Sequence, residues 1–174
     1  MKKVILYVAT SLDGYIARKN GSVDWLTRYS KLGEDFGYKK FLDSIGTIIL
    51  GNTTYEEFKA PYKNKKCFVF SRKNTGKKDN ITFVNDNAKE FIEGLDDENI
   101  WLVGGANIAK DFLKNNLVDD CIITIMPIIL GEGIPLFSKG CGKHNLKLLT
   151  TKSFDSGVVQ LHYTVDLHMK KEIS

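Results

Sequence analysis

The sequence predicts an α/β fold in which a mostly parallel β-sheet carries crossover helices and ends in antiparallel strands. Over the first two-thirds of the chain, short apolar runs of strand length alternate with helical patterns, as in parallel βαβ units. The last third instead holds longer apolar runs, two of them joined by the hairpin-like turn Asp155-Ser156-Gly157. The chain has 174 residues, so we expect a single domain over residues 1–174.

The parallel part predicts five buried strands, because each is a short, nearly continuous apolar run. They span residues 3–9, 47–50, 66–71, 81–84 and 99–103. The spacing of apolar residues predicts helices over 34–44, 53–59 and 106–115, and a fourth helix that is capped by Asn85 or Asp86 and ends at residue 94. Residues 10–33 are expected to form a long loop, because three glycines interrupt any regular pattern.

Three longer strands are expected in the last third, over residues 118–129, 146–154 and 158–167. The apolar run 122–130 contains Thr124 and Pro127 and is far too short for a transmembrane helix. The basic and then apolar N-terminus breaks off at Thr10 without a small-residue cleavage site. We therefore expect a strand there instead of a signal peptide, and a cytoplasmic protein that does not enter a membrane.

The composition is that of an ordinary globular protein. Lys and Arg number 25 against 21 Asp and Glu, and this net charge of +4 is dispersed, which gives little support for nucleic-acid binding. The three cysteines, Cys67, Cys121 and Cys141, form no CxxC pair and no Cys/His ligand spacing. We expect reduced thiols and no metal site.

The strand at 99–103 ends in a pattern that suits an anion. It runs through Val103 into Gly104-Gly105, and a helix begins at once with Ala106, Asn107 and Ile108. Glycines let a ligand approach the backbone closely, and a helix start offers free N–H groups and the positive end of its dipole. The alternative is a tight strand-to-helix turn that binds nothing.

The strand at 47–50 ends in a similar way, at Gly51. A helix follows, with Asn52, Thr53 or Thr54 as its N-cap and Glu56 placed for a capping box. Taken alone, this segment is a capped helix and nothing more. Two such helix starts at strand ends favour the pyrophosphate of a dinucleotide as their joint ligand.

Ser71 and Arg72 form a third polar strand end. The chain has only three arginines, Arg18, Arg28 and Arg72, so an arginine directly after a strand is a distinctive feature. A hydroxyl beside an arginine fits a ribose 2′-phosphate, which would make the cofactor NADP and not NAD. The alternative is an ordinary surface arginine.

The long loop after the first strand carries the candidates for the substrate side. It holds a carboxylate at Asp13 and an indole at Trp25, with hydroxyls at Thr10 and Ser11. Loops of this length inside a compact domain usually serve a function. The alternative is an irregular loop in which Trp25 fills a gap in the core.

Together these segments resemble the dihydrofolate reductase-like superfamily, in order and over essentially the whole chain. The branch they are most similar to is the C-terminal reductase domain of the bifunctional riboflavin-biosynthesis deaminase/reductase. The resemblance implies a three-layer αβα fold, NADPH bound across the strand ends, and a cis peptide bond between Gly104 and Gly105. The segments that carry it are residues 9–17, Gly51 with Thr54-Tyr55-Glu56, Phe70-Ser71-Arg72, residues 101–105 and the late stretch Leu130-Gly131-Glu132-Gly133-Ile134-Pro135-Leu136-Phe137.

The resemblance also implies a role for each site residue. Asp13 would orient the substrate or relay a proton, and Trp25 would lie near the substrate. Ser71 and Arg72 would contact the 2′-phosphate. The other cofactor residues it implies are Ala9 and Ile16 beside the nicotinamide, and Gly51, Thr53, Thr54, Val103, Gly104, Gly105, Ala106, Asn107 and Ile108 around the phosphates.

The sequence departs from the family pattern at two positions. Asn52 stands where the family often has an arginine, and Ser30 stands where dihydrofolate reductases carry a carboxylate for the pteridine, with Glu34 and Asp35 beyond it. We therefore expect an NADPH-dependent reductase of a pterin-like or ribosylamino-pyrimidine small molecule, not of dihydrofolate. The alternative is a nucleotide-binding module that kept the cofactor site and lost catalysis. The long C-terminal strands would support a homodimer.

Overall fold

The computed structural model describes residues 2–59, 62–96 and 98–166. The strands in this part of the chain are β1 (Val4–Ser11), β2 (Tyr15–Ala17), β3 (Thr47–Gly51), β4 (Lys66–Phe70), β5 (Gly76–Lys78), β6 (Ile81–Val84), β7 (Ile100–Gly104), β8 (Asp120–Met126), β9 (Ile134–Pro135), β10 (Asn145–Ser153) and β11 (Val159–Asp166). The helices are the 3₁₀ helix η1 (Asp24–Leu26) and the α-helices α1 (Thr27–Ser30), α2 (Tyr38–Asp43), α3 (Asn52–Phe58), α4 (Ala88–Glu93) and α5 (Ala106–Lys114).

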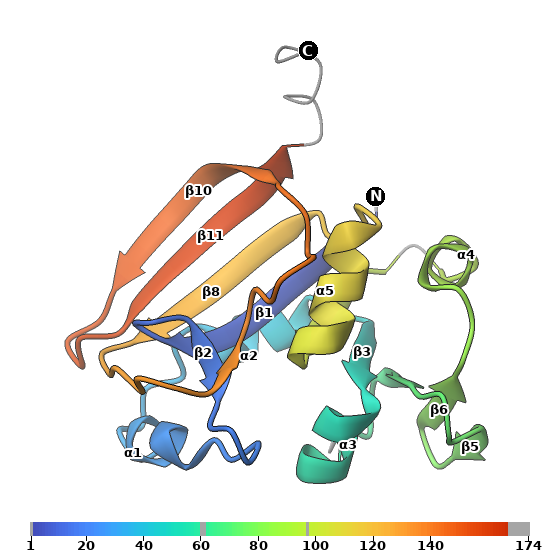
Figure 1. The fold of residues 1–174 in the computed structure, drawn as a ribbon, viewed down its shortest axis with the longest axis horizontal. Helices are drawn as coiled ribbons and strands as arrows, with labels where there is room; N and C mark the ends of the chain where they lie inside the picture. The colour runs from blue at the N-terminus through green and yellow to red at the C-terminus, as the bar shows by residue number, and fades with distance from the viewer. Residues whose placement is uncertain (1, 60–61, 97, 167–174) are drawn as a thin grey trace.

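Most of the strands belong to one mixed sheet of 9 strands, in the order β10-β11-β8-β1-β7-β3-β4-β6-β5 (Figure 1). The central strands from β8 to β6 all run parallel to one another. β10, β11 and β5 pair antiparallel at the two ends of the sheet, and β2 pairs with β9 in a separate small sheet. The mostly parallel sheet with antiparallel C-terminal strands, expected from the sequence, is confirmed.

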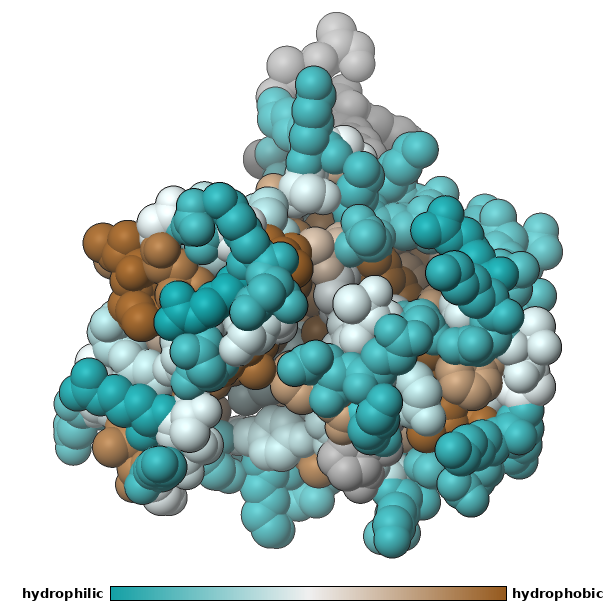
Figure 2. Space-filling view, turned by 60° about the horizontal axis from the view of Figure 1, so that its bottom comes forward, coloured by the Kyte–Doolittle hydropathy of each residue, from teal (hydrophilic) through white to brown (hydrophobic). Residues whose placement is uncertain are grey.

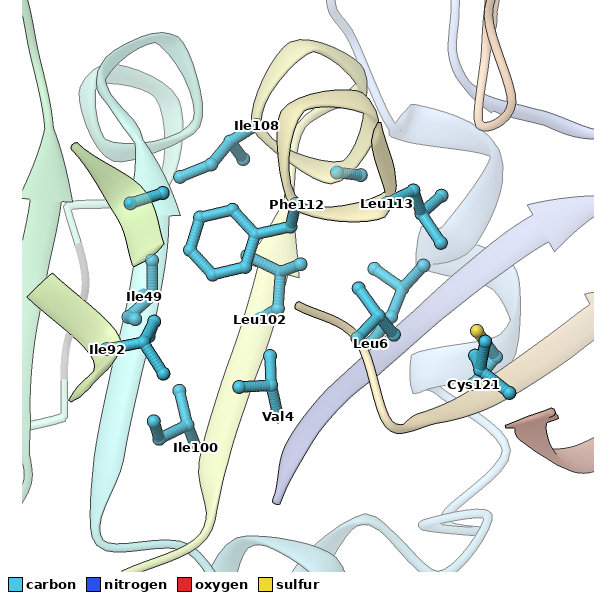
Figure 3. Close-up of a cluster of buried hydrophobic side chains, with 14 of the residues drawn as sticks. Val4, Leu6, Ile49, Ile92, Ile100, Leu102, Ile108, Phe112, Leu113 and Cys121 are labelled. Atoms are coloured by element: carbon cyan, nitrogen blue, oxygen red, sulfur yellow. The ribbon is translucent and has the colours of Figure 1, made fainter. Parts of the chain in front are cut away.

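Helices cover both faces of this sheet because side chains alternate along its central strands. In β1, Val4 and Leu6 belong to one core cluster, which includes the buried residues of α4 and α5. Ile5, from the same strand, belongs to the other cluster, with Phe41 of α2. Figure 3 shows the first cluster, in which the ring of Phe112 lies between α5 and the strands of the sheet. The arrangement is the expected three-layer αβα fold.

The segment expected to be a long loop contains more regular structure than the sequence predicted. It forms β2, which pairs with β9, and the short helices η1 and α1, which are held by packing of Trp25 and Tyr29 and not by a repeating pattern. The helix expected over 34–44 begins only at Tyr38, because Phe36 and Gly37 before it take left-handed backbone angles, with φ of 51° and 80°. The exposed strand β5 had no apolar signal at all.

The start of α4 and the last strands also differ from the expected boundaries. Asn87, and not Asn85 or Asp86, caps α4, with its side chain accepting from the backbone N–H groups of Lys89 and Glu90. β8 ends at Met126, one residue before Pro127, which has no N–H to donate to a neighbouring strand. β11 is described to Asp166, and the expected last residue of that strand, Leu167, lies outside the described residues.

The parallel pairing brings the carboxyl ends of the central strands to one edge of the sheet. The register pairs Leu50 of β3 with Gly104 of β7, Gly51 with Phe70 of β4, and Ser11 of β1 with Met126 of β8. This edge lies toward the bottom of Figure 1. Figure 2 turns it toward the viewer and shows a hollow near its middle, surrounded by polar side chains. Ligands of parallel α/β sheets bind at such edges.

We expect Phe112→Ala to lower the free energy of unfolding by about 3–5 kcal/mol, the range for truncating a fully buried aromatic ring. Phe112 has no exposed surface and its ring also meets that of Phe70 edge-on at 5.8 Å. Urea unfolding followed by circular dichroism measures the change. Phe112→Leu is the matched control and should lose less, because less volume is removed; equal losses would show that packing of the ring is not what stabilises α5.

Candidate functional site at the carboxyl ends of the strands

The turn between β7 and α5 forms the centre of the edge. The peptide bond between Gly104 and Gly105 is cis, as expected, and Gly104 has a φ of 105° that favours glycine. Gly51, at the end of the neighbouring strand, lies against this turn: a Cβ on Gly51 would be 3.9 Å from the Gly104 carbonyl oxygen. Both glycines therefore keep the backbone of the two strand ends open to a ligand.

The helix that follows the turn begins without a side-chain cap. Gly105 is the N-cap residue of α5 and has no side chain that could accept from the first N–H groups. Ala106 and Asn107 open the helix at the edge, whereas the Ile108 side chain packs into the core. The N–H groups of this first turn are what the α5 start offers to an anion.

The first turn of α3 has polar side chains that do not cap their own helix. The sequence predicted a cap by Asn52, Thr53 or Thr54, and this is wrong, because Gly51 is the N-cap and no side chain bonds to the helix start. The Thr54 hydroxyl instead accepts from the Gly105 N–H across the edge, at 2.8 Å. Asn52 reaches Asn74, in the loop after β4, at 2.7 Å. Thr53 is exposed.

The loop after β4 brings the third polar strand end to the same edge. Ser71 is only 5% exposed, and its hydroxyl accepts from the backbone N–H groups of Lys73 and Asn74 at 3.2 and 2.9 Å. Arg72 lies inside this turn and is exposed, and within the described ranges its guanidinium has no hydrogen bond or ion pair. An arginine without a partner at a strand end is available for an anionic ligand.

The Asp13 carboxylate connects two loops at this edge. Its carboxylate accepts from the backbone N–H groups of Leu130 and Gly131, at 3.1 and 2.7 Å. The hydroxyl of Ser11 and these backbone groups lower the pKa of the carboxyl below its usual value. The group is therefore ionised near neutral pH. An ionised carboxylate can hold the loops or orient a substrate by accepting hydrogen bonds, but it is a poor proton donor.

Ala9 and Ile16 lie on the strands before and after the turn that contains Asp13. Ala9 is half-buried near the end of β1 and pairs with Thr124 of β8. Ile16 is half-buried on the short strand β2 and packs against the cluster that contains α5. The two residues are thus on the elements that border the turn at Gly104 and Gly105.

Trp25 is buried in a third apolar cluster that covers the end of β8. The side chain is 5% exposed and packs with Tyr29, Met126 and Val158. Its indole N–H is buried and finds no acceptor in the described part of the chain. Most buried indole N–H groups have a partner. Trp25 therefore fills the core and also has a buried N–H donor without an acceptor among the described residues.

A polar cluster next to Ala9 was missed by the sequence analysis. Gln160 of β11 is 9% exposed, and its side-chain amide donates to the Phe36 carbonyl at 3.1 Å and to the Thr124 hydroxyl at 3.0 Å. The Tyr7 hydroxyl lies 3.5 Å from the same amide. Burial raises the pKa of Tyr7 above its usual value, so the hydroxyl keeps its proton. A glutamine at an inward-facing strand position was the signal in the sequence.

The positions that a pteridine carboxylate would occupy are used for other purposes. Ser30 is exposed and its hydroxyl donates to the Thr27 carbonyl of its own helix at 2.9 Å. Asp35 accepts from the backbone N–H groups of Gly37 and Lys39, which lower the pKa of its carboxyl. Its carboxylate is therefore engaged in starting α2. Glu34 is exposed and contacts the Ser156 hydroxyl at 3.5 Å.

The described residues contain no group of three or more His, Cys, Asp or Glu side chains that could hold a metal ion, and no helix among them is long and apolar enough to cross a membrane. Burial raises the pKa of the Cys67 and Cys121 thiols to about 11 and about 12. A hollow of about 630 Å³ beside Ile45 and Lys66 lies at the amino ends of the strands, opposite the polar edge.

Known proteins share this fold and the sequence that builds it. Two Bacillus subtilis (strain 168) proteins, the uncharacterized YwjB and YyaP, are 42% and 35% identical to the chain, each over 93% of it and over 97% and 94% of their own lengths. A Shewanella sp. PV-4 protein named for riboflavin biosynthesis has a TM-score of 0.84 at 28% identity, over 94% of this chain and 99% of its own.

More distant structures show the same fold. A pyrimidine reductase-like protein of Corynebacterium diphtheriae has a TM-score of 0.70 at 15% identity, over 95% of this chain and 92% of its own. Acinetobacter baumannii RibD gives 0.67 at 16% identity, and this chain covers 58% of its length. The family described as the RibD C-terminal domain matches residues 2–160. With its dihydrofolate reductase-like fold, the chain belongs to the RibD C-terminal domain family, a family of NADPH-dependent reductases.

Proposed function

We propose that this protein is an NADPH-dependent reductase of a pterin-like or ribosylamino-pyrimidine small molecule, similar to 5-amino-6-(5-phosphoribosylamino)uracil reductase. The observation that carries the proposal is that three features suited to binding a ligand lie at one edge of the sheet. These are the open backbone at Gly51 and Gly104-Gly105, the uncapped start of α5, and the unpartnered Arg72. An elongated nucleotide with two separate anionic groups, a pyrophosphate and a 2′-phosphate, fits this arrangement better than any single anion does.

The residues present fit NADPH along its length. The first-turn N–H groups of α5, with Thr53 and Thr54 opposite, would bind the pyrophosphate, and Ser71 and Arg72 would bind the 2′-phosphate. Ala9 and Ile16 would border the nicotinamide, which supplies a hydride when the cofactor is bound. The half-buried Thr54 hydroxyl is already oriented by Gly105, so this part of the site is ordered before any ligand arrives.

The substrate would lie between the nicotinamide and α2, against the polar cluster of Tyr7, Thr124 and Gln160. Thr124 is the register partner of Ala9, so this cluster adjoins the nicotinamide position in the sheet. Its fixed polar groups would orient the ring of the substrate for hydride transfer. Asp13 would act as a positioning residue, because its carboxylate holds the two loops that border the pocket. Trp25, with its unused N–H, would contact the substrate when these loops adjust around it.

The alternative function is a nucleotide-binding module without catalysis. It is favoured by the engagement of Asp13, Ser30 and Asp35 in hydrogen bonds within the protein, which leaves none of these three side chains free to act on a substrate. Oxidation of NADPH with a panel of pterins and ribosylamino-pyrimidines distinguishes the two functions. Turnover with any panel member supports the reductase, whereas tight NADPH binding without turnover supports the module.

We also propose a homodimer that pairs through β10, the edge strand of the sheet. Leu146, Leu148 and Leu149 of this strand are 44–49% exposed, and an apolar edge strand with unpaired backbone groups favours a second strand beside it. A second copy of the chain presents the same edge strand, so pairing covers the exposed leucines and satisfies the unpaired backbone groups. Sedimentation equilibrium tests the proposal: a monomer at micromolar concentration contradicts it.

The reduced, buried Cys67 and Cys121 support a cytoplasmic protein.

We expect NADPH to bind more tightly than NADH, and Arg72→Ala to remove most of the difference. A charge-assisted contact to the 2′-phosphate is worth about 1.5–3 kcal/mol, or roughly ten- to a hundredfold in affinity. Titration of nicotinamide fluorescence measures both dissociation constants. Arg28→Ala, at another exposed arginine, is the matched control. Equal affinities of the unmodified protein for NADPH and NADH would contradict the assignment.

Dihydrofolate should be reduced slowly or not at all. Ser30 bonds to its own helix and offers no carboxylate to the N–H donors of a pteridine, which costs binding and transition-state stabilisation together. Stopped-flow or steady-state absorbance at the NADPH band measures the rate. A turnover number in the common enzymatic range of about 1–1000 per second would show that another group, such as Asp35, takes this role.

Trp25→Phe should leave the free energy of unfolding within about 1 kcal/mol of its original value. The cavity left by the smaller ring costs stability, but removal of a buried donor without a partner offsets that cost. Trp25→Ala, which also removes the packing, should cost about 3–5 kcal/mol. Denaturant unfolding compares the two variants, and a loss above about 2 kcal/mol in Trp25→Phe would reveal a partner for the indole N–H.

A further inference from the structure

The first turn of α3 connects two loops that come from different strand ends. On one side, Asn52 Oδ1 accepts from Asn74 Nδ2 of the loop after β4, at 2.7 Å. On the other side, Thr54 Oγ1 accepts from the Gly105 N–H of the turn after β7, at 2.8 Å. The helix start therefore bridges the loop that carries Arg72 and the turn that opens α5.

The orientation of the Asn52 amide is fixed by its two partners. Its Nδ2 donates to Glu56 Oε1 at 2.7 Å, and a carboxylate oxygen only accepts. Its Oδ1 must therefore face the other way, toward the amide nitrogen of Asn74. Both ends of the side chain are used, so Asn52 is held in the one orientation that accepts from Asn74.

Asn74 lies in the loop of residues 71–75 between β4 and β5. Residues 72–75 are all exposed, so apolar packing does not order them, whereas β5 beyond them is held by its pairing with β6. Asn74 is held at two points: its backbone N–H donates to the buried Ser71 hydroxyl, and its side chain donates to Asn52. Arg72 lies in the sequence between Ser71 and Asn74, which the first of these two hydrogen bonds joins. The Asn52 contact therefore restrains the short turn from which the arginine projects.

We propose that Asn52 is a positioning residue for cofactor specificity, which acts through Asn74 to hold the Arg72 turn where it meets the ribose 2′-phosphate. Asn52 itself need not touch the phosphate. A long exposed arginine has many rotamers, so the strength of its contact depends on where its backbone is fixed. The inference rests on the proposed NADPH site and adds the residue that organises it.

The preference for NADPH over NADH tests this role, because a general structural defect weakens both cofactors alike. In Asn52→Ala and in Asn74→Ala, the ratio of the NADH and NADPH dissociation constants should fall about three- to tenfold, the value of one hydrogen bond. The loss should appear in NADPH and in 2′,5′-ADP, whereas NADH and 5′-AMP should change less than about twofold. Isothermal titration calorimetry measures all four ligands.

The double variant Asn52→Ala/Asn74→Ala separates one shared contact from two independent effects. Because the two residues act through one bond, the double variant should lose no more preference than either single variant. Glu57→Ala is the matched control, since it removes an exposed carboxylate from the same helix and leaves both hydrogen bonds of Asn52, and it should keep the preference. Thermal unfolding should give closely similar midpoints for all variants.

The outcomes keep this inference distinct from the proposed cofactor site. A preference that is lost in Arg72→Ala but kept in Asn52→Ala overturns the positioning role and leaves the site standing. Additive losses in the double variant, or an equal loss in Glu57→Ala, also overturn it. An unmodified protein that binds NADPH and NADH equally overturns the 2′-phosphate site itself, and the positioning role with it.

Discussion

The complete burial of the central parallel strands is the constraint on which the rest of the structure depends. Leu6 of β1, Ile49 of β3 and Leu102 of β7 have no exposed surface and contact the helices on one face of the sheet. Their neighbours in the sequence, such as Ile48, are equally buried on the other face. Strands that are covered on both faces are connected by crossovers and run parallel. Parallel strands must end at one edge, and that edge is where every candidate ligand contact lies.

At this edge, polar side chains connect loops to one another and leave the helix starts open. Neither α3 nor α5 has a side-chain cap, although Asn52 and Thr54 are residue types that commonly provide one. Their oxygens accept instead from the neighbouring loops. Asp13 does the same between β1 and the segment after β8. The loops are thereby ordered in advance, while the N–H groups of the α5 start are left for a ligand.

The opposite end of the sheet contains a buried ionic contact that serves stability and not ligand binding. Asp120, at the start of β8, accepts from Lys3 at 2.9 Å and lies 3.3 Å from His162 of β11. Burial alone would raise the pKa of the Asp120 carboxyl, but its contacts with Lys3, Thr164 and His162 lower it below the usual value. Its stabilising contribution is therefore present above the usual pKa of an aspartate and is lost as the pH falls through the lower folded value.

The sequence by itself determined the order of the longer strands along the chain, the mostly parallel α/β class and the glycine turns, because apolar periodicity and glycine report local backbone needs. It also indicated Ser71 and Arg72 as a strand end. Tertiary structure alone decided which polar atoms meet: Asn52 with Asn74, Thr54 with Gly105, and Tyr7 with Gln160. These partners are far apart in the sequence, and a side chain that suits a helix cap cannot reveal which neighbouring loop it contacts. Only the packing of the sheet brings that loop within hydrogen-bonding distance.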